Sequence, residues 1–170
     1  MTYTIRTAKP SDVPAFAQIE INAGELFKTV GLDSLAGDHS SPEFVMSFVK
    51  TGGAFAAVQD EGSIVGFALA FALDNAIHLQ EMSVDPMHGR QGLGGRLLQV
   101  VAAWASKHDF THVTLSTFED VAWNAPFYKR HGYEIVERPN WTPGLHILRE
   151  HEAHAGLPVA SRCFMRKPLS

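Results

Sequence analysis

Apolar residues repeat along the chain with two different periods, and these periods predict the order of helices and strands. Apolar positions recur at helical spacing from residue 13 to Gly24, from Pro42 to Gly52 and from Gly92 to Lys107. A shorter helix is expected around residues 123–130. The region 25–40 has turn residues and scattered apolar side chains, so we expect a loop there that can include a short helix.

Apolar runs bounded by turn residues predict the strands. The expected strands are residues 3–7, 54–59, 63–73, 77–84, 113–118 and 133–137. Tight turns at 60–62 and 74–75 join three of these runs, which favours an antiparallel meander. The long helix between 77–84 and 113–118 implies that those two strands are parallel. The prediction is therefore α/β: one domain over residues 1–170, with a mixed central sheet and helices on both faces.

The composition limits the classes of protein that the chain can belong to. Of 170 residues, 45% are hydrophobic and 19% are charged, which is typical of a soluble globular protein and argues against disorder. The net charge is −4 with the histidines neutral, so no nucleic-acid partner is expected. The longest apolar run, near residues 65–73, has about half of the roughly 20 residues that a membrane helix needs, so no membrane partner is expected either.

Cysteine usage and the N-terminal residues indicate the cellular compartment in which the protein works. The single cysteine, Cys163, excludes a disulfide framework and a cysteine-based zinc site, and it favours a reducing compartment. No apolar stretch of signal-peptide length is present near residue 1. We therefore expect a cytoplasmic protein.

The segment from Asp85 to Leu98 is the clearest candidate for a binding site. Glycines stand at 89, 92, 94 and 95, where a turn leads from a predicted strand into the long amphipathic helix. Inside a helix each glycine would cost about 1 kcal/mol relative to alanine, so the cluster indicates backbone that approaches a ligand closely. The free N–H groups at a helix start bind anions such as phosphate, and Arg90 and Arg96 could add positive charge. A packing turn without a ligand is the alternative interpretation.

Two nucleotide-binding motifs do not fit this segment. A P-loop needs Gly-x-x-x-x-Gly-Lys-Ser/Thr, and the sequence contains no such string. A Rossmann fingerprint needs a third glycine where this chain has Leu97, and the preceding antiparallel meander does not fit a doubly wound sheet.

Two motifs resemble those of the GNAT N-acetyltransferase superfamily. The first is a coenzyme A pyrophosphate loop after a strand that ends in Val-Asp-Pro; here Val84-Asp85-Pro86 precedes Gly89-Arg90-Gln91-Gly92-Leu93-Gly94. Gly89 departs from the pattern, which usually has Gln or Arg there, so a side-chain role is weakened while the backbone donors remain. The second motif, Asn-x-x-x-Tyr-x-x-x-Gly-Tyr, spans Asn124 to Tyr133. The order of predicted elements also matches over residues 3–138.

The resemblance implies a fold and a cofactor, acetyl-CoA, which serves as the acyl donor. The fold would be a GNAT-like mixed sheet of about six to seven strands, splayed between the fourth and fifth, with a last strand near residues 160–167. The pantetheine arm would enter that gap and face the backbone of Met82 and Val84. The cofactor-binding residues that the resemblance implies are Met82, Ser83, Val84, Gly89, Arg90, Gln91, Gly92, Leu93, Gly94, Gly95, Arg96, Asn124, Phe127 and Tyr128.

The resemblance also suggests roles in acetyl transfer. A phenol with a pKa of about 10 stays protonated at neutral pH and can support a departing thiolate with a pKa of about 8.5, so Tyr128 is the candidate general acid. Glu81 is the candidate base, acting through water; an ordinary solvent-facing glutamate is the alternative. A backbone N–H near Met82 would stabilise the developing oxyanion. Asn124 would bind the pantetheine or cap its own helix.

The residues that would bind the acceptor amine are harder to predict from the sequence. Phe27, His39 and Trp141 are nominated as substrate-binding residues, because the family builds that groove from the first-helix region and the late hairpin. In segment 145–156, His151-Glu152-Ala153-His154 is one residue short of the zinc-binding string His-Glu-x-x-His. We therefore expect no metal and a solvated polar helix there, with a wall over the acceptor pocket or a homodimer contact as alternatives.

These inferences lead to one functional prediction and one alternative. The prediction is an acetyl-CoA-dependent N-acetyltransferase that moves an acetyl group directly to a primary amine, on a small molecule, an amino acid or a peptide N-terminus. The alternative is a non-catalytic acyl-CoA-binding sensor or scaffold. Cys163 is expected to be a small core residue, so a covalent acetyl-cysteine route is not expected.

Overall fold

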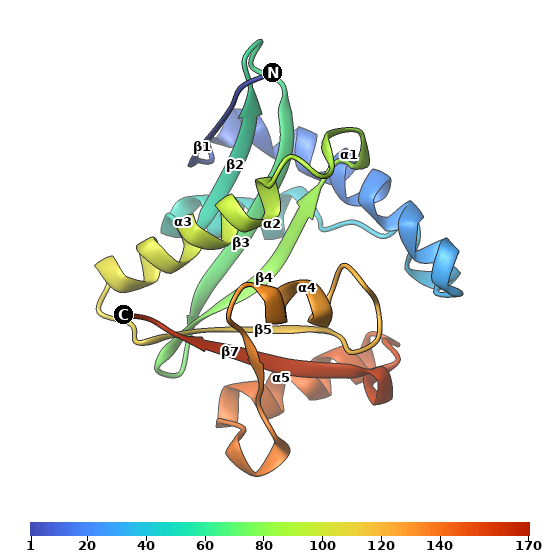
Figure 1. Ribbon diagram of the computed structural model, residues 1–170, viewed down its shortest axis with the longest axis vertical. Coiled ribbons are helices and arrows are strands. Elements are labelled where there is room, and N and C mark those ends of the chain that lie inside the picture. The colour runs from blue at the N-terminus through green and yellow to red at the C-terminus, as the bar shows by residue number, and fades with distance from the viewer. The chain divides into compact units, whose positions relative to one another are not determined.

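A computed structural model describes residues 1–170 (Figure 1). Its seven strands form one sheet in the order β1-β2-β3-β4-β5-β7-β6. Contacts divide the chain into two compact units: unit 1 comprises residues 1–71 and 80–104, and unit 2 comprises residues 72–79 and 105–170. Strand β4 (Ala76–Val84) contributes residues to both units.

Unit 1 contains the antiparallel strands β1 (Tyr3–Thr7), β2 (Ala54–Gln59) and most of β3 (Ile64–Leu73). In their register Ile5 lies opposite Ala57, and Ala56 lies opposite Phe67. The β2–β3 pairing shifts between Ala57 and Val58, the sign of a bulge. The meander expected from the short turns is therefore confirmed for β2 and β3.

Helices cover both faces of the unit 1 strands (Figure 1). Helices α1 (Val13–Gly24) and α2 (Pro42–Thr51) bury Phe16 and Phe48 in a cluster with Ala56 and Phe67 of the strands. Helix α3 (Leu93–Lys107) lies on the other face, where Leu93 packs with Tyr3, Ala57 and Val65. Alternate residues of β2 thus point to opposite helix layers, as period-two geometry requires.

Unit 2 contains β5 (His112–Phe118), β7 (Arg162–Pro168) and the two-residue β6 (Glu134–Ile135). Strands β5 and β7 are antiparallel and pair from His112–Pro168 to Phe118–Arg162. Helices α4 (Ala125–Arg130) and α5 (Pro143–His154) lie on opposite sides of these strands (Figure 1).

The parallel pair β4–β5 confirms the crossover that the sequence predicted. Registered pairing runs only from Ile77–Val113 to Leu79–Leu115. Strand β4 continues to Val84 and β5 continues to Phe118 beyond this register. The mixed sheet and this short parallel pairing agree with the predicted fold class.

The loop 25–40 contains short helical turns, as the sequence allowed: two 3-10 segments, Glu25–Val30 and Asp33–Leu35. Two other local predictions need correction. The expected strand 133–137 is only Glu134–Ile135. The polar helix near 145–156 exists as α5, but it is not solvated all round, because Leu145 is buried against Val136 and Phe164. No helix is both long and apolar enough to cross a membrane.

Candidate functional site

The glycine-rich turn of unit 1 has a backbone conformation suited to anion binding. A short 3-10 segment, Pro86–His88, follows β4, and α3 begins at Leu93. Between them Arg90 and Gly92 adopt left-handed φ values of 60° and 74°. Left-handed residues in a turn can bring successive N–H groups together into an anion-binding concavity. A left-handed φ is sterically strained for a non-glycine residue such as Arg90, and backbone strain of this kind is concentrated at functional sites.

Several amide groups at this turn have no acceptor in the helix. The first backbone bond into α3 runs from the Arg96 N–H to the Gly92 carbonyl oxygen at 3.1 Å. The N–H groups of Leu93, Gly94 and Gly95 come before that bond, so they are the unpaired donors of the helix start. Unpaired donors and the positive end of the helix dipole together favour a phosphate-like anion.

Side chains anchor the turn from its N-terminal side. The Asp85 carboxylate accepts a hydrogen bond from the Met87 N–H at 2.9 Å and another from Asn22 of α1 at 2.8 Å. Arg96, expected to add charge to the site, uses one guanidinium nitrogen to donate to the Tyr3 carbonyl oxygen at 2.8 Å. The Arg90 side chain is exposed.

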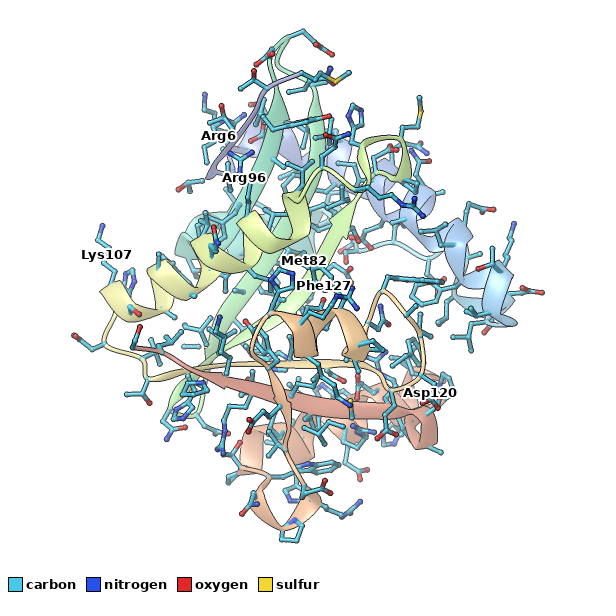
Figure 2. All side chains as sticks on the ribbon, in the orientation of Figure 1. Arg6, Met82, Arg96, Lys107, Asp120 and Phe127 are labelled. Carbon is cyan, nitrogen blue, oxygen red and sulfur yellow. The ribbon has the colours of Figure 1, made fainter.

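The part of β4 in unit 1 presents Glu81 and Ser83 on one face. The Ser83 hydroxyl donates to the Glu81 carboxylate at 3.0 Å, which confirms that the two side chains lie together. Val84 packs with Tyr3, Ala57 and Leu93 on the α3 side. By alternation Met82, which Figure 2 labels, shares the α3 side with Val84. The same alternation puts Glu81 on the opposite face, the one that α1 and α2 cover.

The second motif lies in unit 2 around α4. Tyr128 is 8% exposed, and its ring contacts the rings of Phe127 and Tyr133. Asn124 precedes α4 but makes no side-chain cap bond; its side-chain oxygen instead accepts from the Phe118 N–H at 3.4 Å. The capping alternative for Asn124 is therefore wrong. Its backbone oxygen accepts from the Tyr128 N–H at 3.0 Å, which ties the two motif residues together.

The nominated acceptor residues lie in different units. Phe27 and His39 belong to the α1–α2 connection of unit 1. Trp141 belongs to unit 2, where its indole N–H donates to the Val136 carbonyl oxygen at 2.9 Å and its ring packs against Phe164. A substrate role for these three residues stays a prediction.

A family model described as the acetyltransferase (GNAT) family matches residues 26–133, more than half of the chain. The chain belongs to this family. The matched residues include the glycine-rich turn and the Asn124–Tyr133 motif, the two sequence features on which the resemblance was based.

Solved structures of other acetyltransferases share the fold of this GNAT protein. N-acetylglutamate synthase from Neisseria gonorrhoeae, solved with coenzyme A and N-acetyl-glutamate, matches with a TM-score of 0.75 and 16% identity. The match covers 100% of this chain but only 36% of that one. The ribosomal-protein-S18-alanine N-acetyltransferase from Escherichia coli matches with a TM-score of 0.67 and 21% identity over 99% and 95% of the two chains.

A third match is PaiA N-acetyltransferase from Thermoplasma acidophilum, solved in complex with coenzyme A. Its TM-score is 0.65 at 15% identity, over 99% of each chain. At such low identities these matches establish the common fold and leave the acceptor open.

One polar residue near the predicted acceptor side was missed in the sequence. Glu20 of α1 accepts from the Ser40 N–H at 2.9 Å, while its second carboxylate oxygen is buried without a hydrogen-bond partner. Burial raises the pKa of this carboxyl, against the opposing effect of the Ser40 hydrogen bonds. Glu20 follows the buried Phe16 by four residues, and residues four apart lie on the same face of a helix. That spacing is the sequence signal that could have shown Glu20 facing inward.

Potential metal ligands form no cluster of three or more in the structure. His146 contacts the Trp141 ring, and His154 bonds the Glu150 backbone oxygen in its own helix.

Proposed function

We propose that this GNAT protein transfers the acetyl group of acetyl-CoA directly to a primary amine. The observation that carries the proposal is the row of unpaired N–H groups at Leu93, Gly94 and Gly95, beside the left-handed turn. Coenzyme A carries a diphosphate, the kind of anion that such a row binds. Two structural relatives were solved with coenzyme A, which supports the assignment.

In this proposal unit 1 holds the donor and receives the amine proton. The amides of residues 89–95 bind the diphosphate, with Arg90 adding a charge at the exposed edge. The backbone of Met82, Ser83 and Val84 lines the pantetheine arm. The Glu81 carboxylate accepts the proton of the incoming ammonium through water, and Ser83 orients that carboxylate by its 3.0 Å hydrogen bond. Bound acetyl-CoA supplies the acetyl group as a thioester.

In unit 2 the Tyr128 hydroxyl holds the proton that the departing thiolate needs. A phenol stays protonated at neutral pH, because its ordinary pKa is about 10. Asn124 positions the start of α4 through its bonds to Tyr128 and Phe118. Phe127 packs on the Tyr128 ring and forms an apolar surface for the donor.

Direct transfer is favoured over an acetyl-cysteine intermediate. Burial raises the pKa of Cys163 to about 11, so its thiol is protonated and weakly nucleophilic at neutral pH. A free, buried cysteine also fits a reducing compartment, and we propose the cytoplasm as the place of action.

The test of this function is release of free thiol from acetyl-CoA in the presence of an amine panel. The panel contains free amino acids, peptides with free N-termini and small polyamines, since relatives are named as acting on glutamate and on a ribosomal-protein alanine. We expect amine-dependent thiol release with at least one class. Tight binding of acetyl-CoA in calorimetry without turnover on any amine would instead support the non-catalytic sensor.

Tyr128→Phe is the sharpest variant, and Tyr133→Phe is its matched control. The Tyr133 hydroxyl is buried without a partner, and its ring lies 5.8 Å from that of Tyr128, so its removal tests for general disturbance of the motif. We expect Tyr128→Phe to lower kcat about 10²-fold or more with little change in the Kd of acetyl-CoA. Tyr133→Phe should keep kcat within about twofold, because it removes an unpaired polar group. Equal kcat in both variants would remove the acid role.

A further inference from the structure

A single residue of β1 contacts both ends of the glycine-rich turn. The Tyr3 hydroxyl lies 3.0 Å from His88 Nδ1, and the two rings meet edge to face with centroids 5.8 Å apart. The Tyr3 carbonyl oxygen accepts from the Arg96 guanidinium at 2.8 Å. His88 immediately precedes the turn and Arg96 lies in the first turns of α3, so Tyr3 links the two flanks.

Packing holds Tyr3 in this position. Its side chain is 8% exposed and belongs to a cluster with Ala57, Val65 and Leu93. Leu93 is the first residue of α3, and Arg96 follows it by three positions, on the same side of the helix. Figure 2 shows Arg96 extending from α3 toward β1. The start of α3 is therefore bound to β1 by an apolar contact and a hydrogen bond.

The turn between these contacts needs such support. Arg90 has a left-handed φ of 60°, which a non-glycine residue adopts only when its surroundings hold it there. The donors at Leu93, Gly94 and Gly95 must also keep a fixed direction to bind an anion without an ordering cost. Asp85 fixes the strand end of the turn through Met87 and Asn22, but it does not contact the helix end.

We propose that Tyr3, together with His88 and Arg96, forms a clamp that positions the turn for the diphosphate of the donor. This inference rests on the proposed function, because it assumes that the turn binds a diphosphate. Tyr3 is a positioning residue, because its hydroxyl contacts His88 and the Met1 sulfur and its carbonyl oxygen accepts from Arg96, all of them groups of the protein. The clamp contributes to affinity for the diphosphate and leaves the acetyl-transfer chemistry unaffected.

The test compares ligands with and without the diphosphate. Tyr3→Phe keeps the ring and removes the hydroxyl that meets His88. We expect Tyr3→Phe to raise the Kd of acetyl-CoA, and of adenosine 3′-phosphate 5′-diphosphate as a fragment that carries the diphosphate, about three- to tenfold, the effect of one hydrogen bond. The Kd of S-acetyl pantetheine, which lacks the diphosphate, and kcat at saturating acetyl-CoA should not change.

Controls separate positioning from general destabilisation. Ile5→Val trims the same apolar cluster on the same strand without touching His88 or Arg96, so it should lower the thermal midpoint modestly and leave the Kd of acetyl-CoA unchanged. His88→Leu should raise Kd as much as Tyr3→Phe, and the double variant should be no worse than either single one. If Tyr3→Phe fails to fold, Arg96→Met tests the clamp from the α3 end of the turn, because it removes the hydrogen bond to the Tyr3 carbonyl oxygen.

The outcomes distinguish this inference from the function on which it rests. If wild-type protein shows no binding of acetyl-CoA, the proposed function fails and the clamp fails with it. If wild-type protein binds acetyl-CoA and the Tyr3, His88 and Arg96 variants bind it equally well, the clamp is wrong while the function stands. A parallel loss of affinity for S-acetyl pantetheine would also contradict the clamp, because it would indicate general damage.

Discussion

His78 illustrates how a single buried residue sets a property of the protein. Its side chain is 2% exposed, and its Nδ1 lies 2.8 Å from the Thr114 hydroxyl on the neighbouring strand. Burial, with a smaller contribution from the positive charge of Arg162, lowers the pKa of His78 to about 3. The imidazole is therefore neutral in the folded protein over the physiological range.

We predict that His78 makes the folded protein sensitive to acid. The unfolded chain takes up a proton on this imidazole below about pH 6.5, whereas the folded protein does so only near pH 3. The free energy of unfolding should thus fall as pH falls through this window, by up to about 1.4 kcal/mol per pH unit from this group. Above about pH 6.5 His78 is neutral in both the folded and the unfolded chain, so it does not contribute to the pH dependence of stability.

Urea unfolding at pH 4, 5, 6, 7 and 8 checks this prediction. His78→Gln keeps a polar partner for Thr114 but does not titrate, so its stability should vary less between pH 4 and 6 than that of the wild type. Parallel curves for the two proteins would show that His78 does not cause the acid sensitivity.

At the scale of elements, α5 shows how a polar helix can be anchored through charges. The Glu152 carboxylate accepts from Arg162 at 2.8 Å and from the Ser116 hydroxyl at 2.7 Å. Arg149 lies 3.4 Å from the same carboxylate and stacks over the Phe164 and Trp141 rings. These contacts join α5 to β5 and β7, and Glu152 connects two arginines that would otherwise repel each other.

We predict that Glu152→Gln destabilises the protein, with Glu150→Gln as the matched control. Removing the carboxylate leaves two partly buried guanidinium groups without their counter-charge, a change that costs about 3 kcal/mol at buried ion pairs. Glu150 lies on the exposed side of the same helix, so its change should stay within about 0.5 kcal/mol. Urea unfolding at neutral pH measures the stability of both variants. Equal stabilities for Glu152→Gln and Glu150→Gln would mean that the contacts of Glu152 with the two arginines contribute nothing.

At the scale of the whole molecule, ligand binding should appear as stability of the native state. Acetyl-CoA at about 100 times its Kd should add about 2.7 kcal/mol to the free energy of unfolding, because it binds only the folded protein. Gly92→Ala should reduce this gain: a Cβ there meets no atom of the protein but stands at the proposed diphosphate site.

Gly52→Ala is the control for the backbone strain. Gly52 also has a left-handed φ, 80° against 74° for Gly92, and open space around its Cβ position. Both variants should therefore lose similar stability without ligand, about 1 kcal/mol, while only Gly92→Ala loses part of the gain from acetyl-CoA. Differential scanning fluorimetry with and without acetyl-CoA makes the comparison. An equal gain in both variants would argue against diphosphate binding at this turn.

The helices and strands of this protein were predictable from its sequence to different degrees. Apolar periodicity placed the strands and long helices to within a few residues, because burial of one face imposes the period directly. It failed at β6, where Tyr133 and Val136 are apolar and buried but only Glu134–Ile135 pair with β7. Apolar periodicity also led to the prediction of a solvated helix at α5, because a rule based on apolar residues does not predict that arginine and glutamate side chains are buried.

Patterns along the chain were enough to establish the element order, the α/β class and the two motifs that place the chain in the GNAT family. Local periodicity and short glycine patterns carry that information, since each depends on residues close together in the chain. Three features became visible only in the folded chain: Tyr3 meets both His88 and Arg96, Glu81 faces the α1 and α2 side, and Glu152 joins Arg149 to Arg162. Those pairings join distant segments, and which polar groups meet depends on strand register and packing, which no local pattern specifies.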